Sequence, residues 1–409
     1  MTVEKAPAQL RRTARLVRWG VLAAVLVGLT VLAALHQRVG VGKPVGVDAL
    51  CPFGGLETLG TLVTGGFLIK RIALSSVLLL GATVITALVF RRAFCGRICA
   101  LGYLQELAGG LGRRLFGARR TLPEALDRPA RLLKYIVLAV VLALSWTTAS
   151  LVIRPYDPWA AYNHLASAEL LTEFGIGFAV LLVSLAGSLV YDRFFCKYAC
   201  PMGAFLGLIS KASVFAVRRT PETCIDCGAC DRACPVNLTV STADAVTSAE
   251  CIDCGECVAA CPVKDTLAVA TRAGHRLSPV WSAVLPVALF AALVAGATAA
   301  GAFAWTLPTL ADTIEQAPGS APGAPRFDTS LIKGNTTLAE VADAGGIAPE
   351  VFTRVYGVPV SEQARPLKEL KDLYGCTPGE IRAFVAAYAA DPTVVESWVP
   401  GGYHDDEDH

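Results

Sequence analysis

The sequence predicts an all-α membrane core of about five transmembrane helices, a small α+β module rich in cysteine before the last of them, and a small α-helical domain near the C-terminus. Three observations predict this arrangement. The chain of 409 residues is 54% hydrophobic and only 17% charged, whereas about a quarter of the residues in a soluble domain are charged. Five long segments contain no charged residue. Twelve of the 14 cysteines fall into regularly spaced groups, which favours metal binding over disulfides.

The uncharged segments are the predicted membrane spans. A hydrocarbon core about 30 Å thick is crossed by about 20 helical residues. The segments cover residues 19–35, 72–90, 135–153, 174–191 and 278–306. The first follows a basic stretch and so resembles a secretory signal, but four further spans follow and no clear cleavage site ends it. We therefore expect a retained anchor.

Basic residues predict the orientation of the chain. The N-terminal 18 residues carry five of them and the loop 91–134 carries ten, whereas the loop 154–173 carries only Arg154. Lysine and arginine collect on the cytoplasmic side of a membrane. The N-terminus and residues 202–278 are therefore expected in the cytoplasm, and the C-terminal domain is expected outside it.

Two segments share the spacing C-x2-C-x2-C-x3-C-P, namely "CIDCGACDRACP" (224–235) and "CIDCGECVAACP" (251–262). Bacterial ferredoxins with two [4Fe–4S] clusters have this spacing, and the fourth cysteine of each run ligates the cluster of the other run. The predicted ligands of the first cluster are Cys224, Cys227, Cys230 and Cys261. Those of the second are Cys251, Cys254, Cys257 and Cys234. A zinc site does not explain two complete runs, and disulfides are rare in the cytoplasm.

The membrane core shows a duplication. The stretch Arg92-Ala-Phe-Cys95-x3-Cys99-x2-Gly102 recurs 101 residues later, from Arg193 to Gly203. The preceding loops, "CPF" (51–53) and "DPW" (157–159), also correspond and are expected on the outer face. Parallel repeats of this kind are related by an axis along the membrane normal.

Each repeat carries a C-x3-C pair whose side chains share one helix face. Two pairs around the axis would bring together four thiols as a candidate third centre: Cys95, Cys99, Cys196 and Cys200. Four thiols could bind a third iron–sulfur cluster, zinc or copper, or act as a dithiol relay. They could also be small apolar residues that pack at helix ends. The residues leave these alternatives open.

The stretches "FCGRICALGYLQE" and "FFCKYACPMGAFLGLISK", followed by the two runs, resemble the polyferredoxin membrane proteins of the NapH and NosR types. The resemblance covers residues 17–300, and Ala100 replaces the proline that the family has after its first cysteine pair. It implies electron transfer between the quinone pool and redox proteins, by a subunit without independent catalysis. NosR-type proteins also carry covalent FMN at an S-G-A-T-like motif. The similar stretches "LGATVIT" and "AGAT" lie inside uncharged spans, so no covalent FMN is expected.

If a quinone reacts at the outer face, its head group needs a proton donor or acceptor. The loop 154–173 offers Asp157, His164 and Glu173 as candidates. Aromatic residues in the same loop are also typical of an interfacial belt. Cys51 and Cys376 are both expected outside the cytoplasm, and a disulfide between them, a free thiol at Cys51 and simple packing remain open.

The C-terminal region predicts a separate domain. A linker rich in proline and glycine (307–326) leads to two predicted helix pairs (327–391) and an acidic tail (392–409). From residue 326 onward, the chain contains seven basic and fourteen acidic residues. This excess of negative charge argues against binding to nucleic acid. We expect this domain to dock an extracytoplasmic redox partner or to cover the membrane core.

The full predicted organisation is a basic N-terminus (1–18), the duplicated core (19–219), the ferredoxin module (220–270), the fifth span (278–306) and the C-terminal parts given above. The predicted function is electron transfer in the cell membrane between quinone or an outer redox protein and two cytoplasmic [4Fe–4S] clusters. Two alternatives remain: a factor that handles copper or assists the maturation of a metalloenzyme, and a redox sensor. The sequence does not fix the direction of electron flow, because cluster potentials depend on their surroundings.

Overall fold

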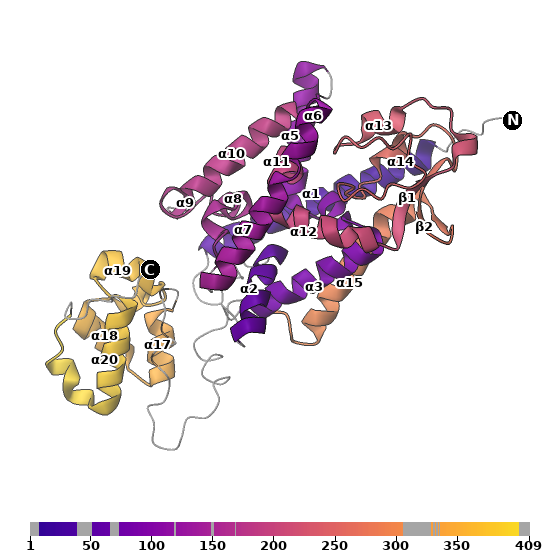
Figure 1. Ribbon diagram of the computed structural model, residues 1–409. Coiled ribbons are helices and arrows are strands. Elements are labelled where there is room, and N and C mark those ends of the chain that lie inside the picture. Colours follow the sequence, from indigo (N-terminus) through magenta and orange to yellow (C-terminus); the bar gives the residue numbers. More distant parts are fainter. Residues whose placement is uncertain are drawn as a thin grey trace. The chain divides into compact units, whose positions relative to one another are not determined.

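The computed structural model describes residues 8–38, 51–65, 73–117, 120–148, 151–167, 169–305, 329, 332, 334 and 336–400. The chain forms two compact units (Figure 1). Unit 1 reaches Phe303 and contains the membrane core and the cysteine-rich module, and unit 2 contains the C-terminal domain. The predicted linker 307–326 and residues 401–409 of the predicted tail lie outside the described residues.

Each of the five uncharged segments contains most of one helix of unit 1 or lies within it. These helices are α1 (Ala8–Arg38), α3 (Ala73–Phe90), α7 (Leu133–Thr148), α10 (Gly175–Val190) and α15 (Pro279–Ala299). Among the described residues, three helical segments are long and apolar enough to cross a membrane: Ala8–Gln37, Glu124–Thr148 and Pro279–Ala299. The apolar helices Leu74–Phe90 and Gly175–Val190 are shorter. The structure therefore gives three candidate spans where the sequence predicts five.

The "CPF" and "DPW" motifs start helices, because proline suits the first helical position. Helix α2 (Pro52–Gly65) precedes α3, and α8 (Pro158–Asn163) precedes α10. The side chain of Asp157 caps α8 by accepting a hydrogen bond from the Trp159 N–H at 2.9 Å. Helix α2 touches α3 so closely that a Cβ atom added at Gly55 would lie 2.3 Å from the Ser76 carbonyl oxygen.

After each apolar helix the chain repeats a short helix and a longer one. The first half has α4 (Ala93–Arg97) and α5 (Ala100–Phe116), and the second has α11 (Phe194–Tyr198) and α12 (Pro201–Ile209). Helix α5 packs on α10, and α12 packs on α7 and α3. Helix α5 of the first half therefore covers a helix of the second half, and α12 contacts helices of both halves. The shorter elements of this region are α6 (Glu124–Ala130), η1 (Arg154–Tyr156), α9 (Glu169–Thr172) and η2 (Ser210–Ala212).

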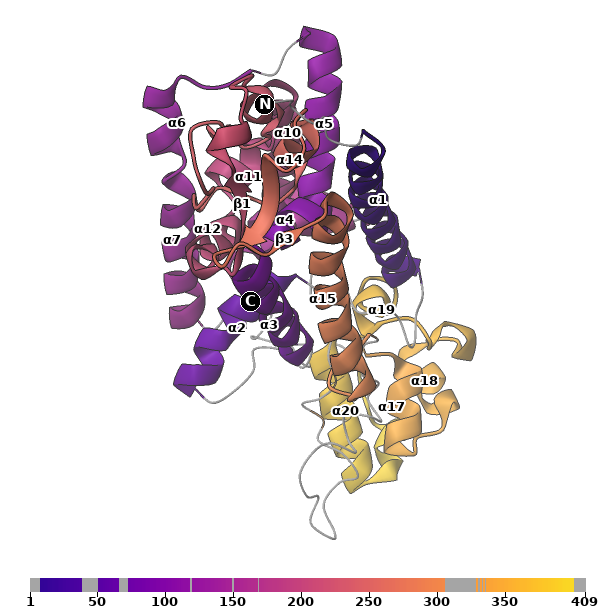
Figure 2. The ribbon, with the colours of Figure 1, turned by 90° about the vertical axis from the view of Figure 1, so that its right-hand side faces the viewer.

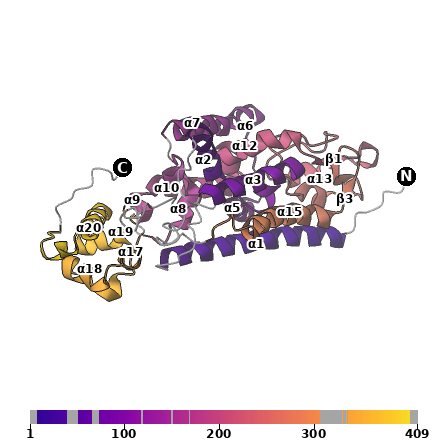
Figure 3. The ribbon, with the colours of Figure 1, turned by 90° about the horizontal axis from the view of Figure 1, so that it is seen from below.

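The cysteine-rich module is a small α+β unit, as predicted. Strands β1 (Phe215–Arg219), β2 (Leu267–Thr271) and β3 (Arg276–Leu277) form an antiparallel sheet in the order β1-β2-β3. Phe215 pairs with Thr271 across β1 and β2. The cysteine runs lie between these strands, with η3 (Pro221–Thr223), α13 (Ala229–Ala233) and α14 (Glu256–Ala260). The start of α1 and the start of α15 lie side by side next to this module (Figures 2 and 3).

Unit 2 contains two helix pairs. Helices α17 (Leu338–Gly345) and α18 (Pro349–Tyr356) form the first pair, and α19 (Leu367–Tyr374) and α20 (Pro378–Ala390) form the second. The second pair repeats the first 29 residues later, and the corresponding residues Thr337 and Pro366 face each other in a β-bridge. Cys376 is a free thiol in the apolar core. Residues of η6 (Pro392–Glu396) and Trp398 pack on the same core, so the ordered domain extends beyond residue 391.

Candidate iron–sulfur sites and the thiols of the core

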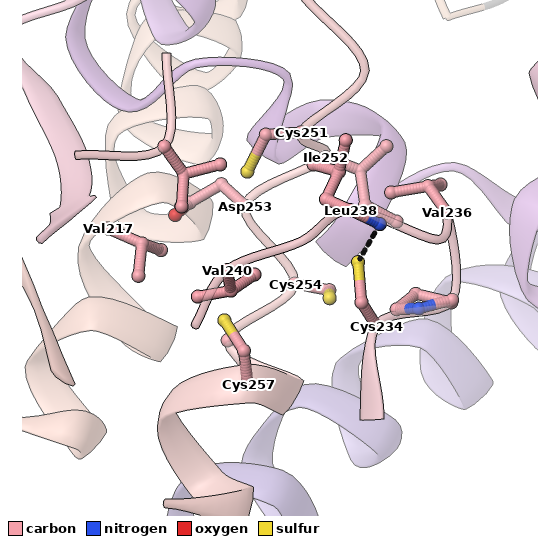
Figure 4. Close-up of a pocket in the computed structure, with 13 residues that line it drawn as sticks. Val217, Cys234, Val236, Leu238, Val240, Cys251, Ile252, Asp253, Cys254 and Cys257 are labelled. Carbon is pink, nitrogen blue, oxygen red and sulfur yellow. Dashed lines mark hydrogen bonds between the residues drawn. The ribbon is translucent and has the colours of Figure 1, made fainter. Parts of the chain in front are cut away.

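The second cysteine run lines a pocket in unit 1. Cys251, Cys254 and Cys257 share it with Cys234 of the first run (Figure 4). The rest of the lining is mostly apolar, from Val217, Val236, Leu238, Val240, Val246 and Ile252. The Leu238 N–H donates a hydrogen bond to the Cys234 sulfur at 3.4 Å. An apolar hollow with four thiols suits a group that is held by thiolates and shielded from water.

The first run lines a second pocket of the same kind. Its cysteines are Cys224, Cys227 and Cys230, together with Cys261 of the second run. Each pocket therefore combines three cysteines of one run with the fourth cysteine of the other. This exchange arises because α13 and α14 pack against each other, which brings the end of each run to the loop of its counterpart.

The thiols around the second pocket are strongly perturbed by their surroundings. Burial raises the pKa of Cys251 and that of Cys254 to about 11, while the nearby guanidinium groups of Arg91 and Arg18 act in the opposite direction. Thiols with such pKa values stay protonated at neutral pH unless a metal ion binds, because the charge of a metal ion deprotonates a coordinating thiol. The pocket is therefore suited to thiolates only with iron present.

The structure brings the four thiols of the C-x3-C pairs together. Burial raises the pKa values of Cys99 and Cys200, and the nearby cysteines raise them further. Cys196 and Cys95 act on Cys99, and the other three cysteines act on Cys200. Together these effects raise the pKa of Cys99 to about 12. The Gln105 side-chain amide donates a hydrogen bond to the Cys196 sulfur at 3.1 Å, and the Gly203 N–H donates one to Cys200 at 3.3 Å.

Two buried arginines lie among these thiols and are exchanged between the halves. A Cβ atom added at Gly203 would lie 2.6 Å from Arg92, and one added at Gly102 would lie 2.8 Å from Arg193. The arginine of each R-x-F-C-x3-C-x2-G motif thus packs on the glycine of the other motif. Arg193 also donates to the Cys95 carbonyl oxygen at 2.7 Å and to the Glu106 carboxylate at 2.8 Å.

The Nε–H groups of Arg92 and Arg193 are buried donors with no hydrogen-bond partner in the part of the chain that the structure describes. Such donors are costly unless an acceptor is bound beside them. Their positive charge fits an anionic group held by the thiols. Among the same residues, no three His, Cys, Asp or Glu side chains meet at a point that could hold a single metal ion.

The core thiols lie beside the second pocket. Cys95 and Cys200 belong to the same apolar cluster as Cys234, Ile252 and Cys254. The contact is close, because a Cβ atom added at Gly96 would lie 2.2 Å from the Ile252 carbonyl oxygen.

Buried ion pairs also join the membrane core to the cysteine-rich module. Arg18 of α1 donates to the Gly96 carbonyl oxygen and pairs with Glu106 of the core and Glu256 of the module. Because one arginine bridges both partners, the module is held firmly on the core.

Cys51 lies elsewhere than the sequence predicts. It was expected on the outer face, a membrane thickness away from the C-x3-C pairs. Instead it packs in the apolar cluster of Cys95 and Cys200, and it acts electrostatically with Cys99 and Asp157. The reason is that Cys51 directly precedes α2, which packs against α3 and α7. Cys51 is a free thiol, like Cys376.

The three predicted proton-exchange residues occupy different environments. Asp157 caps α8 near Cys51. His164 ends α8 and is buried, with its ring centroid 4.2 Å from that of Phe174. Glu173 is exposed. Of the three, only Asp157 lies next to a thiol in the contacts described above, namely that of Cys51.

Sequence reasoning missed Glu57, Gln105 and the pairing of Arg92 and Arg193 with glycines of the opposite half. Glu57 is buried in α2 and accepts a hydrogen bond from the Ser145 hydroxyl at 2.6 Å. A signal was present, since it is the one charged residue in the stretch 52–65. The exchange of arginines leaves no comparable signal within one motif.

Comparison with protein families finds two families that match three segments of the chain. A 4Fe-4S dicluster domain matches residues 216–262. A 4Fe-4S binding domain matches twice, at residues 72–119 and 174–220. The first match contains both cysteine runs, and the two others contain one C-x3-C pair each.

Curated relatives point in the same direction. The chain is 35% identical to the putative electron transport protein YccM of Escherichia coli over 215 residues, which is 51% of this chain and 59% of YccM. It is 33% identical to the protein NirI of Paracoccus denitrificans over 42% of this chain and 24% of NirI. It is 31% identical to the ferredoxin-type protein NapH of Escherichia coli over 44% of this chain and 59% of NapH. The chain thus spans well under two thirds of these relatives. No solved structure matches it.

Proposed function

Since this chain is a polyferredoxin-type 4Fe-4S protein of the NapH and NosR family, we propose that it carries electrons between a membrane quinone and a redox protein by way of two [4Fe–4S] clusters. The matched families and the names of the relatives support iron–sulfur electron transfer. The quinone, the number of clusters and the redox partner are parts of the proposal.

The proposed ligands follow the two pockets. Cys224, Cys227, Cys230 and Cys261 hold the first cluster, and Cys251, Cys254, Cys257 and Cys234 hold the second. The bound clusters supply one-electron redox chemistry. The chain supplies the thiolates, the apolar walls that exclude water, and the charges that tune the potential.

We also propose that Cys95, Cys99, Cys196 and Cys200 hold a third iron–sulfur centre. The match of both segments to a 4Fe-4S binding domain supports this. So do the unpaired Nε–H donors of Arg92 and Arg193, which suit the negative charge of a cluster on four thiolates.

One observation carries the proposed route. Cysteines of the second pocket and of the core thiols share a single apolar cluster, so redox centres at these two places would be neighbours without water between them. Electrons entering the core would then reach the module through buried contacts. The first pocket, whose Cys227 is exposed, would exchange electrons with a soluble partner.

The proposed topology places the N-terminus and the module in the cytoplasm and unit 2 outside it, in a cell membrane. The distribution of basic residues in the loops supports this. Asp157 and His164 remain our candidates for proton exchange with the quinone, and Glu173 is a more distant one because its side chain is exposed.

The test is the iron content and redox behaviour of the full chain, purified anaerobically. Three cubane clusters predict about twelve irons per chain, and two predict about eight. Electron paramagnetic resonance should show clusters that become reduced when a quinol analogue is added. Protein without iron and acid-labile sulfide would refute the cluster assignment. Iron-loaded protein that dithionite reduces and no quinol reduces would refute the quinone.

A further inference from the structure

Glu57 is a carboxyl group enclosed on several sides in unit 1. Its side chain is 1% exposed. Helix α2, which carries it, packs against α3 and α7. On the α3 side the contact leaves no room for a Cβ atom at Gly55, and on the α7 side a Cβ atom at Gly60 would lie 2.1 Å from the Trp146 ring. Water therefore has little access to the carboxyl group.

The described partners of Glu57 are neutral. The Ser145 hydroxyl donates to its carboxylate at 2.6 Å, and the Ile153 N–H donates at 3.3 Å. In the described part of the chain no arginine or lysine forms an ion pair with it. Burying a lone carboxylate is costly. An ionisable side chain retained inside a membrane core is by default a candidate functional group.

The titratable neighbours of Glu57 lead toward the thiols. Asp157 lies close enough to act electrostatically on both Glu57 and Cys51, and Cys51 acts in turn with Cys99. On the other sides, the buried polar residues of α3 are serines and threonines, and those of α7 are Ser145 and Lys134, which pairs with Glu250. The guanidinium group of Arg154 packs over the Phe174 ring, 5.2 Å from its centroid. Asp157 therefore links the Glu57 carboxyl group electrostatically to Cys51, next to the core thiols.

The duplication shows that a carboxyl group is not required for the fold at this position. Glu57 lies six residues after Cys51, and Asn163 lies six residues after Asp157 in the other half. Asn163 is also buried, and its Oδ1 atom has no partner among the described residues. Both halves place a polar side chain here, but only the first half places a group that can carry a proton.

We propose that Glu57 accepts a proton from a quinol that is oxidised in the membrane core, an inference that rests on the quinone of the proposed function. A quinol releases two electrons and two protons when it becomes a quinone. The two [4Fe–4S] clusters of the module each take one electron. The Glu57 carboxylate takes one proton, and the Asp157 carboxylate takes the other. Asp157, which is only half-buried, then returns the protons to water.

The test compares Glu57→Gln with the matched control Glu124→Gln, whose carboxylate is exposed and pairs with Arg128 on the surface. Both variants are made in the full chain and loaded with iron. A well-placed general base is worth about 10²–10⁴-fold in rate. Glu57→Gln should therefore slow cluster reduction by a quinol at least about 100-fold, with unchanged iron content and unchanged reduction by dithionite. Glu124→Gln should behave as wild type.

A second measurement does not depend on turnover. Infrared difference spectra of quinol-treated against oxidised protein should contain a carboxylic-acid C=O band that is lost in Glu57→Gln and shifted in Glu57→Asp. If wild-type clusters are reduced by quinol and Glu57→Gln matches wild type in rate and spectrum, the role of Glu57 is refuted and the proposed function stands. If quinol does not reduce the wild-type clusters at all, the proposed function fails, and this inference fails with it.

Discussion

The two cysteine runs begin with the same five residues, "CIDCG", at 224–228 and 251–255. Their backbones also agree, since φ is 49° at Asp226 and 48° at Asp253. Their surroundings differ sharply. Ile225 is 51% exposed and Ile252 is 2% exposed, while Asp226 is exposed and Asp253 is buried opposite Arg97 at 3.5 Å. Local sequence therefore specifies the cysteine loop, whereas docking on the core decides its electrostatics.

Positively charged side chains are concentrated at the second cysteine run, the docked run, which packs on the membrane core. Arg92 donates to the Ala249 carbonyl oxygen at 3.0 Å, and Arg91 donates to the Ser248 carbonyl oxygen. Arg18 pairs with the Glu256 carboxylate. All three arginines are buried. A positive charge stabilises the more negative, reduced form of a nearby cluster. If the proposed clusters are present, the two runs should thus respond differently to changes in the core.

The largest effect should come from Glu106→Gln. The Glu106 carboxylate pairs with Arg18 and Arg193, all three being buried. Removing one partner of a buried ion pair costs about 3–5 kcal/mol. Because Arg18 also holds the module through Glu256, we expect loss of iron at the second run before the first. Thermal unfolding and iron analysis measure both effects, and a variant with wild-type iron and stability would contradict the role given to this network.

The same group predicts a pH dependence. Burial favours the protonated form of Glu106, but Arg193 and Arg18 outweigh it and lower the pKa to about 2. A carboxyl group with a lowered pKa stabilises the fold above its unfolded pKa of about 4.5 and loses this contribution as the pH falls toward 2. Acid unfolding of wild type should steepen in this window, and Glu106→Gln should lack that component.

A smaller effect should follow from Gly96→Ala. The added methyl group meets the Ile252 carbonyl oxygen at 2.2 Å, and overpacking of this kind costs about 1–3 kcal/mol. The strain falls on the docked run alone. Gly81→Ala is the control, because nothing lies within 4 Å of that position. Paramagnetic resonance should show a disturbed signal from one cluster only, and equal changes in both clusters would argue against docking through Gly96.

A charge change should shift one potential. Arg97→Gln removes a buried cation beside Asp253, and Arg232→Gln removes an exposed one that donates to the Cys227 carbonyl oxygen at 2.9 Å. One charge about 10 Å away in a medium of dielectric constant about 20 is worth about 1.7 kcal/mol, or roughly 70 mV for one electron. Redox titration should show the second cluster falling by tens of millivolts in Arg97→Gln, and a smaller, salt-dependent change at the first cluster in Arg232→Gln.

The smallest effect should be that of Ile225→Ala. Substitutions at exposed positions change stability by less than about 0.5 kcal/mol. The same substitution at Ile252 leaves a cavity and should cost about 2–5 kcal/mol. Chemical denaturation of the two variants measures the difference directly. Similar costs at both positions would show that the first run is also covered by protein.

The cysteine runs could be predicted from sequence because their ligand spacing is local. The exchange of Cys234 and Cys261 also follows from the motif, and each of the two pockets contains the expected four cysteines. Hydropathy found an apolar helix in all five segments, but not that Leu74–Phe90 and Gly175–Val190 are shorter than the three candidate spans. The length of an uncharged segment does not show where its helix ends. Both of these helices end just before an R-x-F-C motif.

The position of Cys51 could not be predicted in this way. Reading the chain as spans and loops assigns every loop to a membrane face, so a helix that starts within the core is misplaced. Glu57 was missed for the same reason, since its burial depends on α3 and α7 closing around α2. Such contacts between distant segments are set by packing, which leaves little trace in the order of residues.

The crossed contacts of Arg92 with Gly203 and of Arg193 with Gly102 limit how this architecture can be divided. A chain with only one half would bury a guanidinium group with no glycine to receive it and would leave a notch unfilled. Two copies of one half, facing each other, would supply both missing contacts. The present chain therefore has the internal geometry of a symmetric dimer whose subunits have been joined end to end, and separating its halves should abolish folding unless they are expressed together.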